Sequence, residues 1–220
     1  MDSVSGVGVL DKAVGVLRAL RAGGALGLGE LQAATGLPRA TAHRLAVALE
    51  EHGLVRRDAA GRFCLGFELI ALGRMAADAF PLGEVARPLL AELRDRTGES
   101  VQLFVREGEE RRCVVSLQSP HGLRWIVPEG ARLPLEVGSA GRVLGSAGAR
   151  TGEAVESVEE REAGVASVSA AVRGRDGAVV AAVSVSGPVE RLSRHPAQRF
   201  GAAVTACAEV LGTALAETGL

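Results

Sequence analysis

The sequence is poor in several residue types, and each shortage excludes a class of protein. Aromatic residues make up 3% of the 220 residues, with no tyrosine and a single tryptophan, Trp125. The three cysteines, Cys64, Cys113 and Cys207, are far apart, form no CxxC pair and lie at no metal-ligand spacing from a histidine. This pattern predicts reduced thiols in a reducing compartment, not a disulfide framework or a zinc site.

Long apolar runs are also missing, although 47% of the residues are hydrophobic. Arg, Glu or Gly interrupts each apolar stretch before it reaches the roughly 18 residues that a membrane-spanning helix needs. The N-terminus shows no basic stretch followed by an apolar run, so no signal peptide is expected. We therefore expect a cytoplasmic protein with material for a core and no membrane partner.

Sequence motifs of the common enzyme classes are absent as well. There is no Gly-x-Ser-x-Gly turn, no P-loop and no HExxH, and the four histidines are scattered. Glu159, Glu160 and Glu162 form an acidic run that fits a solvated turn better than a ligand site. The sequence predicts a protein that is not an enzyme and that has no cofactor or metal.

Charge is unevenly distributed, although the formal net charge is only −1. Residues 1–66 carry a net positive charge and the rest of the chain a net negative one. Lys12 is the only lysine, so arginine supplies nearly all of the positive charge. A basic small segment before an acidic larger one suits a DNA-binding domain joined to a domain that does not bind DNA.

Residues 1–66 show the element order of a winged helix-turn-helix. Apolar residues at helical spacing predict three helices: Val9–Ala22, Leu28–Thr35 and Pro38–His52. Gly36 stands where a tight turn needs a positive φ, and Pro38 suits the first position of the third helix. Two strand-like segments, Leu54–Arg57 and Arg62–Leu65, follow as a hairpin. Helix, helix, turn, helix and hairpin is the winged helix-turn-helix order.

The second helix of a helix-turn-helix enters the major groove with its N-terminal residues. Four side chains there are candidates for contact with base edges: Arg39, Thr41, His43 and Arg44. Arginine can bind guanine through two hydrogen bonds, and threonine can contact a base edge or a thymine methyl group. Three arginines of the hairpin are candidates for contact with phosphates: Arg56, Arg57 and Arg62. The ordinary alternative is that each is an exposed surface charge.

The remaining residues predict a linker helix and a second domain. Phe67–Ala79 is helical up to Pro81, so the boundaries are 1–66 for the head, 67–80 for the linker and 81–220 for the second domain. In the second domain we expect helices at Leu82–Thr97, Gly138–Gly145 and Ser193–Glu217, and strands at Ser100–Arg106, Arg112–Gln118, Leu123–Val127, Ala166–Arg173 and Val179–Ser186. The fold class is therefore α+β with an antiparallel sheet.

Five segments carry a resemblance to a known family. They are Gly6–Ala13 (GVGVLDKA), Ala40–Leu45 (ATAHRL), Thr97–Ser100 (TGES), Glu160–Ser167 (EREAGVAS) and Val183–Pro188 (VSVSGP). In this order they resemble the IclR family of bacterial regulators, and most closely the NdgR and LtbR type that controls amino-acid biosynthesis. The resemblance implies a winged-helix head on operator DNA, a GAF-like effector domain, and homodimers or dimers of dimers.

The resemblance also implies an effector pocket between the sheet and the short helix near Ser139. Its residues match family positions that contact small carboxylates: Leu135, Ser139, Ala140, Glu159, Ser167, Ser184 and Ser186. The implied effector is an amino acid or a small organic acid. This chain departs from the family at about 145–158, where relatives have a longer segment. The alternative is that the shortened domain only dimerises and binds no effector.

Overall fold

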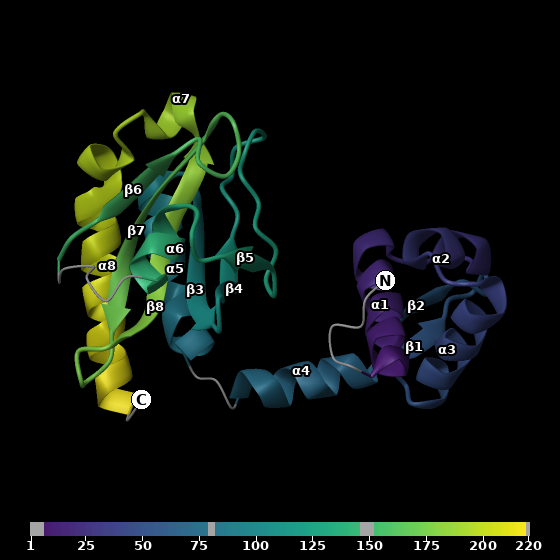
Figure 1. Ribbon diagram of the computed structural model, residues 1–220. Coiled ribbons are helices and arrows are strands. Elements are labelled where there is room, and N and C mark those ends of the chain that lie inside the picture. The colour runs from purple at the N-terminus through teal and green to yellow at the C-terminus, as the bar shows by residue number, and fades with distance from the viewer. Residues whose placement is uncertain (1–6, 79–81, 146–151, 219–220) are drawn as a thin grey trace. The chain divides into compact units, whose positions relative to one another are not determined.

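The computed structural model describes residues 7–78, 82–145 and 152–218. The chain divides into two compact units between residues 79 and 80, and each unit is treated by itself below (Figure 1). The expected end of the linker helix at Pro81 lies outside the described residues, as does most of the shortened connection after Gly145.

The first unit has the predicted winged helix-turn-helix order. Its elements are α1 (Gly8–Gly23), α2 (Leu28–Thr35), α3 (Arg39–Glu51), β1 (Val55–Arg57), β2 (Phe63–Leu65) and α4 (Glu68–Asp78). Gly36 ends α2 with a φ of +66°, as the turn requires, and Pro38 caps α3. Val16, Leu31 and Phe63 are buried in a core shared by the three helices and the hairpin.

One glycine sets how the hairpin leaves this core. A Cβ atom on Gly66 would lie 1.9 Å from the carbonyl oxygen of Gly53, so only glycine fits there. The close approach lets the amide of Gly66 donate to the carbonyl of Leu54 at 2.9 Å. The end of β2 is thereby fixed against the end of α3, which holds the hairpin beside the third helix.

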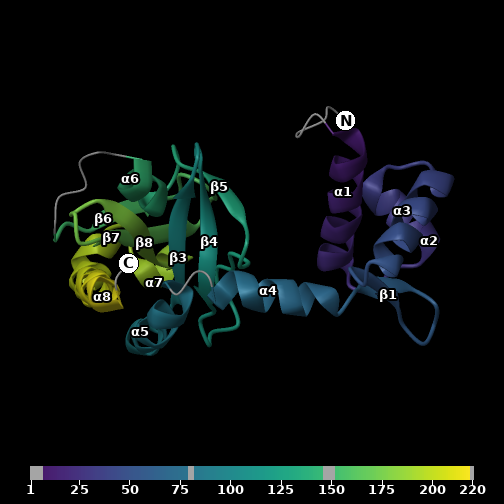
Figure 2. The same cartoon turned by 90° about the horizontal axis from the view of Figure 1, so that it is seen from below.

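The second unit is one antiparallel sheet with helices on both faces. Its elements are α5 (Leu82–Thr97), β3 (Ser100–Glu107), β4 (Glu110–Leu117), β5 (Arg132–Pro134), α6 (Ser139–Gly145), β6 (Val155–Val158), β7 (Val165–Arg173), β8 (Val179–Pro188), α7 (Val189–Leu192) and α8 (Pro196–Thr218). The strand order is β5-β4-β3-β8-β7-β6. Helices α5 and α8 cover one face, and α6 covers the other (Figure 2).

Two cores follow from this layering. Alternate residues of β3, β7 and β8, such as Leu103, Val168 and Val183, pack against α5 and α8. Residues of the opposite parity, such as Phe104 and Ala182, pack against α6. The segment Pro196–Glu217 of α8 is long and apolar enough to cross a membrane by composition alone, a test that core helices of globular domains also pass. Here it packs against β7.

The structure corrects the expected elements in three places. The predicted strand Leu123–Val127 is irregular, and Leu123 is 72% exposed, so its alternating apolar residues do not mark a sheet face. The short elements β5, β6 and α7 were not predicted. The last helix starts at Pro196 instead of Ser193, because Ser193 has a φ of +72° and separates α7 from α8.

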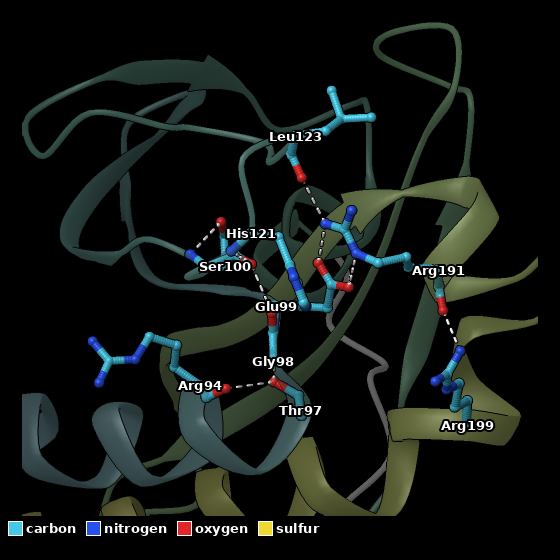
Figure 3. A network of polar contacts seen from close by, with 10 residues as sticks. Arg94, Thr97, Gly98, Glu99, Ser100, His121, Leu123, Arg191 and Arg199 are labelled. Carbon is cyan, nitrogen blue, oxygen red and sulfur yellow. Dashed lines mark hydrogen bonds and ion pairs between the residues drawn. The ribbon is translucent and has the colours of Figure 1, made fainter.

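A buried ion pair holds the irregular segment in place (Figure 3). Glu99, immediately before β3, is 3% exposed and accepts two hydrogen bonds from Arg191 of α7, at 2.5 and 2.8 Å. Arg191 also donates to the carbonyl of Leu123 at 2.8 Å. The hydrogen bonds that Arg191 donates to Glu99 raise the pKa of Arg191. Arg191 thus connects three separate parts of the unit.

Candidate DNA-binding surface and effector pocket

The predicted base-contacting residues lie on the surface of α3. Arg39, His43 and Arg44 are exposed and Thr41 is half-buried. Arg39 and Arg44 form no ion pair with any residue that the structure describes. Thr41, His43 and Arg44 also line an open groove of about 680 Å³ whose other wall includes Lys12 of α1. The surface of α3 is therefore basic and accessible.

The three arginines of the hairpin are more constrained. Arg57 is paired with Glu50 of α3 at 3.2 Å, and its guanidinium lies 4.3 Å from the centre of the Phe63 ring. Arg62 is paired with Asp58 at 2.8 Å, and Arg56 lies over the Phe67 ring at 4.9 Å. These contacts orient the hairpin, and a phosphate would have to compete with two carboxylates for Arg57 and Arg62.

The turn of the hairpin depends on Asp58. Its carboxylate accepts hydrogen bonds from the amides of Ala60 and Arg62, each at 2.9 Å, and from Nε of Arg62. The backbone hydrogen bond from Arg62 is the main reason that the pKa of Asp58 is lowered. The turn Asp58–Gly61 is therefore a locally hydrogen-bonded structure.

In the second unit, polar residues from four strands form the floor of a small cavity beneath α6. The strand register aligns four serines in one row: Ser100, Ser186, Ser167 and Ser157. The neighbouring row contains Gln102, Ser184 and Ser169. Ser139 at the start of α6 shares hydrogen bonds with Ser167 at 2.7 Å and with Ser169 at 2.8 Å. Hydroxyl groups thus line the face of the sheet that α6 covers.

The structure brings five of the seven implied pocket residues together around this cavity. They are Ser139, Ala140, Ser167, Ser184 and Ser186. Leu135 does not line the cavity, because it is buried in the apolar core beneath α6. Glu159 does not line it either: it follows β6 with a φ of +56°, and its carboxylate pairs with Arg194 at 3.1 Å. The strand residue Ser157 faces the cavity instead.

Sequence reasoning missed the residues that complete the cavity wall. The most important are Gln102, Phe104, Arg111, Trp125 and Arg161. Gln102 and Phe104 could have been found from the period-two spacing of β3, because they follow Ser100 on the same face. The other three come from β4 and from two loops, and no local pattern marks them.

The cavity is electropositive inside. Burial, followed by the repulsion of Arg161, lowers the pKa of Arg111 to about 10. Burial also lowers the pKa of Arg161, whose guanidinium lies 4.8 Å from the centre of the Trp125 ring. Glu160 at the rim is paired with Arg142 at 2.8 Å and accepts from the amide of Gly138. Glu162 is exposed.

Two buried donors of this cavity have no hydrogen-bond partner among the described residues, Nε2 of Gln102 and Nε of Arg111. Unpaired buried donors are costly, so they point to a bound acceptor. The cavity volume of about 40 Å³ has room for roughly three water molecules. Within residues 7–78, 82–145 and 152–218, no cluster of His, Cys, Asp or Glu is arranged to hold a metal ion.

Comparisons with known proteins match both units. The family model described as IclR helix-turn-helix domain matches residues 9–59. The model described as bacterial transcriptional regulator IclR C-terminal matches residues 75–155 and, as a second segment, 148–213.

Individual relatives agree with these matches. The chain is 31% identical to the glycerol operon regulatory protein of Streptomyces coelicolor over an alignment of 238 positions, gaps included. The alignment covers 92% of this chain and 94% of that protein. It is 34% identical to the regulator KipR of Bacillus subtilis, over about half of each protein (54% and 48%). An IclR homologue from Microbacterium hydrocarbonoxydans, solved with 4-hydroxybenzoate, has a TM-score of 0.75 at 21% identity, covering 94% of this chain and 98% of that one.

Proposed function

The chain belongs to the IclR family of bacterial transcriptional regulators, and from that premise we propose that it is an effector-responsive regulator. It is a DNA-binding protein and not an enzyme. In the proposal, α3 contacts operator bases through Arg39, Thr41, His43 and Arg44, and Arg56, Arg57 and Arg62 contact phosphates. A small molecule in the cavity beneath α6 changes operator affinity.

One observation carries the effector part of the proposal. The cavity is lined by hydroxyl groups and contains two buried donors without partners, at Gln102 and Arg111. Each buried donor that stays unpaired costs about 1–3 kcal/mol, so the site favours an occupant that accepts hydrogen bonds. A ligand that accepts hydrogen bonds explains why they are kept.

The effector class in this proposal is an amino acid or a small organic acid. The finer assignment is to the NdgR and LtbR type, which would place amino-acid biosynthesis genes under its control. The relative from S. coelicolor is named for a glycerol operon, and the Microbacterium homologue was solved with an aromatic acid. A ligand screen should therefore include amino acids, small organic acids and glycerol derivatives.

An alternative is that the shortened domain binds no effector and only dimerises. The alignment with the S. coelicolor relative spans more positions than this chain has residues, and the C-terminal family model matches in two segments that overlap at residues 148–155. Both facts support a shortened segment near 145–158. Under either reading we propose a cytoplasmic homodimer or dimer of dimers, acting on a partly palindromic operator.

The test is binding of genomic DNA fragments by the purified protein, followed by sequencing, with and without a pool of candidate ligands. We expect a short recurrent palindrome whose enrichment changes with ligand. Recurrent sites that no ligand affects would favour the dimerisation reading. If no site is enriched at moderate salt, the operator part of the proposal is wrong.

A further inference from the structure

We propose that Arg111, together with Gln102, anchors the effector, and that the effector presents a compact oxyanion, a carboxylate or a phosphate, to these two residues. The inference rests on the proposed effector function and names the chemistry of that same pocket. Neither residue belongs to the set that the family resemblance implied, and both line the cavity beneath α6.

The guanidinium of Arg111 has one edge occupied and one edge open. Its Nη1 donates to the carbonyls of Pro134 and Val137, the latter at 2.8 Å. Its Nε is buried without a partner, and no described residue hydrogen-bonds to Nη2. Nε and Nη2 form the side edge of the guanidinium, which matches two oxygens of a carboxylate or phosphate. The open edge is therefore a preformed site for an oxyanion.

The surrounding backbone holds this guanidinium in position. A Cβ atom on Gly141 would lie 2.5 Å from Nη1 of Arg111 and 2.3 Å from the carbonyl oxygen of Leu135. Glycine at 141 thus lets α6 approach the arginine closely. On its other side the guanidinium lies 5.4 Å from the centre of the Phe104 ring. Arg111 is 3% exposed and cannot turn away to solvent.

Gln102 supplies a second donor of fixed direction. Its Oε1 accepts a hydrogen bond from the hydroxyl of Ser186 at 2.8 Å, which leaves Nε2 as the free end of the amide. The side chain is 1% exposed, and Nε2 has no partner. An acceptor that reaches both Nε2 and the open edge of Arg111 satisfies the two buried donors at once.

The electrostatics of the cavity favour an anion. Among the groups that line it, Arg161 is a second cation, Glu160 is neutralised by Arg142, and Glu162 is exposed to solvent. The volume of about 40 Å³ limits the ligand to a few non-hydrogen atoms unless the cavity widens. A compact oxyanion fits this charge and this size.

Ligand binding can be followed directly through Trp125, the only tryptophan in a chain without tyrosine. We would titrate the full chain with glycolate, alanine, inorganic phosphate and neutral glycolamide, using tryptophan fluorescence and calorimetry. We expect at least one oxyanion to bind and glycolamide to bind at least tenfold more weakly. Carboxylate and phosphate probes separate the two sources of the oxyanion. Equal affinity for glycolate and glycolamide would overturn the inference.

Two variants test the residues themselves. Arg111→Lys keeps the charge but loses the open edge, and should weaken binding by roughly ten- to a hundredfold. Gln102→Glu keeps the acceptor for Ser186 but replaces the donor by a carboxylate oxygen, and should abolish anion binding in the folded protein, with a lower Tm because the new carboxylate is buried. The matched control is Arg106→Lys, because Arg106 is exposed and bonded to its own turn. It should bind as the wild type does.

The outcomes distinguish this inference from the function on which it rests. Wild-type affinity in Gln102→Glu, or in a folded Arg111→Lys, would overturn the anchor while leaving an effector function intact. If operator binding responds to a small molecule but no oxyanion binds, the inference is wrong and the effector function stands. If oxyanions bind as expected but no operator exists, the anchor stands and the proposed function fails.

Discussion

At the scale of single residues, the arginines of the first unit differ in what their guanidinium groups contact. Arg44 is exposed and unpaired among the described residues, whereas Arg57 is held by Glu50 and by the Phe63 ring. An unpaired arginine on α3 is free to bond to a base edge. A paired arginine in the hairpin keeps a fixed position, and in the proposed complex it contributes charge at the phosphate backbone.

This difference leads to a prediction for operator binding. Arg44→Ala should weaken binding to the operator by about 1–3 kcal/mol while changing binding to random DNA much less. Arg57→Ala should weaken both by similar factors and lower the slope of log K against log salt by about one unit at most. Fluorescence anisotropy at several salt concentrations measures the affinity of each variant for operator and for random DNA, and the salt slope of each. Equal losses for Arg44→Ala on both DNAs would refute a base contact.

A second prediction concerns the thiols. Burial raises the pKa of Cys113 to about 12 and that of Cys207 to about 11, with Glu129 and Glu92 adding to the two shifts. At pH 8 the reactive thiolate of Cys113 is then about 10⁻⁴ of the total. Cys64 is half-buried in the hairpin. Iodoacetamide labelling followed by mass spectrometry should therefore modify Cys64 first.

The same shifts fix the direction of the pH dependence. A thiol with a raised pKa binds its proton more tightly in the folded state, so stability should fall as pH rises from about 9 toward 12. Labelling in urea is the control, since all three thiols should then react at similar rates. Faster reaction of Cys113 than of Cys64 in the folded protein would contradict the burial that the structure gives it.

At the scale of elements, the ion pair between Glu99 and Arg191 joins β3, α7 and the irregular segment at Leu123 (Figure 3). Its two members are unequally buried, since Glu99 is 3% exposed and the Arg191 side chain 29%. Removing the arginine leaves a buried carboxylate without a partner, whereas removing the carboxylate leaves an arginine that water can reach. The two substitutions should differ in cost.

We predict that Arg191→Met lowers the free energy of unfolding by about 3 kcal/mol and Glu99→Gln by about half of that. The double variant should cost at least about 0.5 kcal/mol less than the sum. Urea unfolding followed by Trp125 fluorescence measures this cycle. Arg94→Met is the control, because its ion pair with Asp95 is exposed and should contribute little. Additive costs would show that the pair does not couple these elements.

Element prediction from sequence succeeded where the signal is local. Gly36 and Pro38 mark backbone conformations that the chain adopts regardless of its partners, so the helix-turn-helix could be predicted. It failed at Leu123–Val127, whose alternation resembles a strand but whose backbone is held by a distant arginine. Whether a segment with alternating apolar and polar residues pairs into a sheet depends on the strands beside it. A short window of sequence does not contain those strands.

The pocket residues, too, could be predicted only where the sequence signal is local. Ser184 and Ser186 could be assigned to one strand face by spacing alone, and the structure places both on the cavity floor. Arg111 could not, because its position depends on carbonyls of residues 134 and 137 that strand pairing brings to it. Glu159 was implied by the family resemblance alone, whereas the structure places Ser157, two positions earlier, on the cavity wall and pairs the carboxylate of Glu159 with Arg194.

At the scale of the whole molecule, the two units have separate cores, and the proposed function requires them to be coupled. Coupling between a ligand and an operator is a free energy that both sites share. A ligand that binds two states of the protein equally well would shift nothing, however tightly it binds. The effector must therefore bind the operator-competent state with a different affinity from the other state.

This requirement gives a prediction that is independent of the mechanism of coupling. If an oxyanion effector changes operator affinity by some factor, typically about 5- to 150-fold, saturating operator must change effector affinity by the same factor. Titrating the effector against Trp125 fluorescence, with operator and with random DNA of equal length, measures it. Random DNA should leave effector affinity nearly unchanged, because phosphate contacts alone do not select the operator-bound state. If the effector alters operator binding but the affinity read at Trp125 does not change with operator, the coupled binding event lies at another site, because reciprocity must hold at the site that regulates. The cavity beneath α6 would then not be the regulatory site.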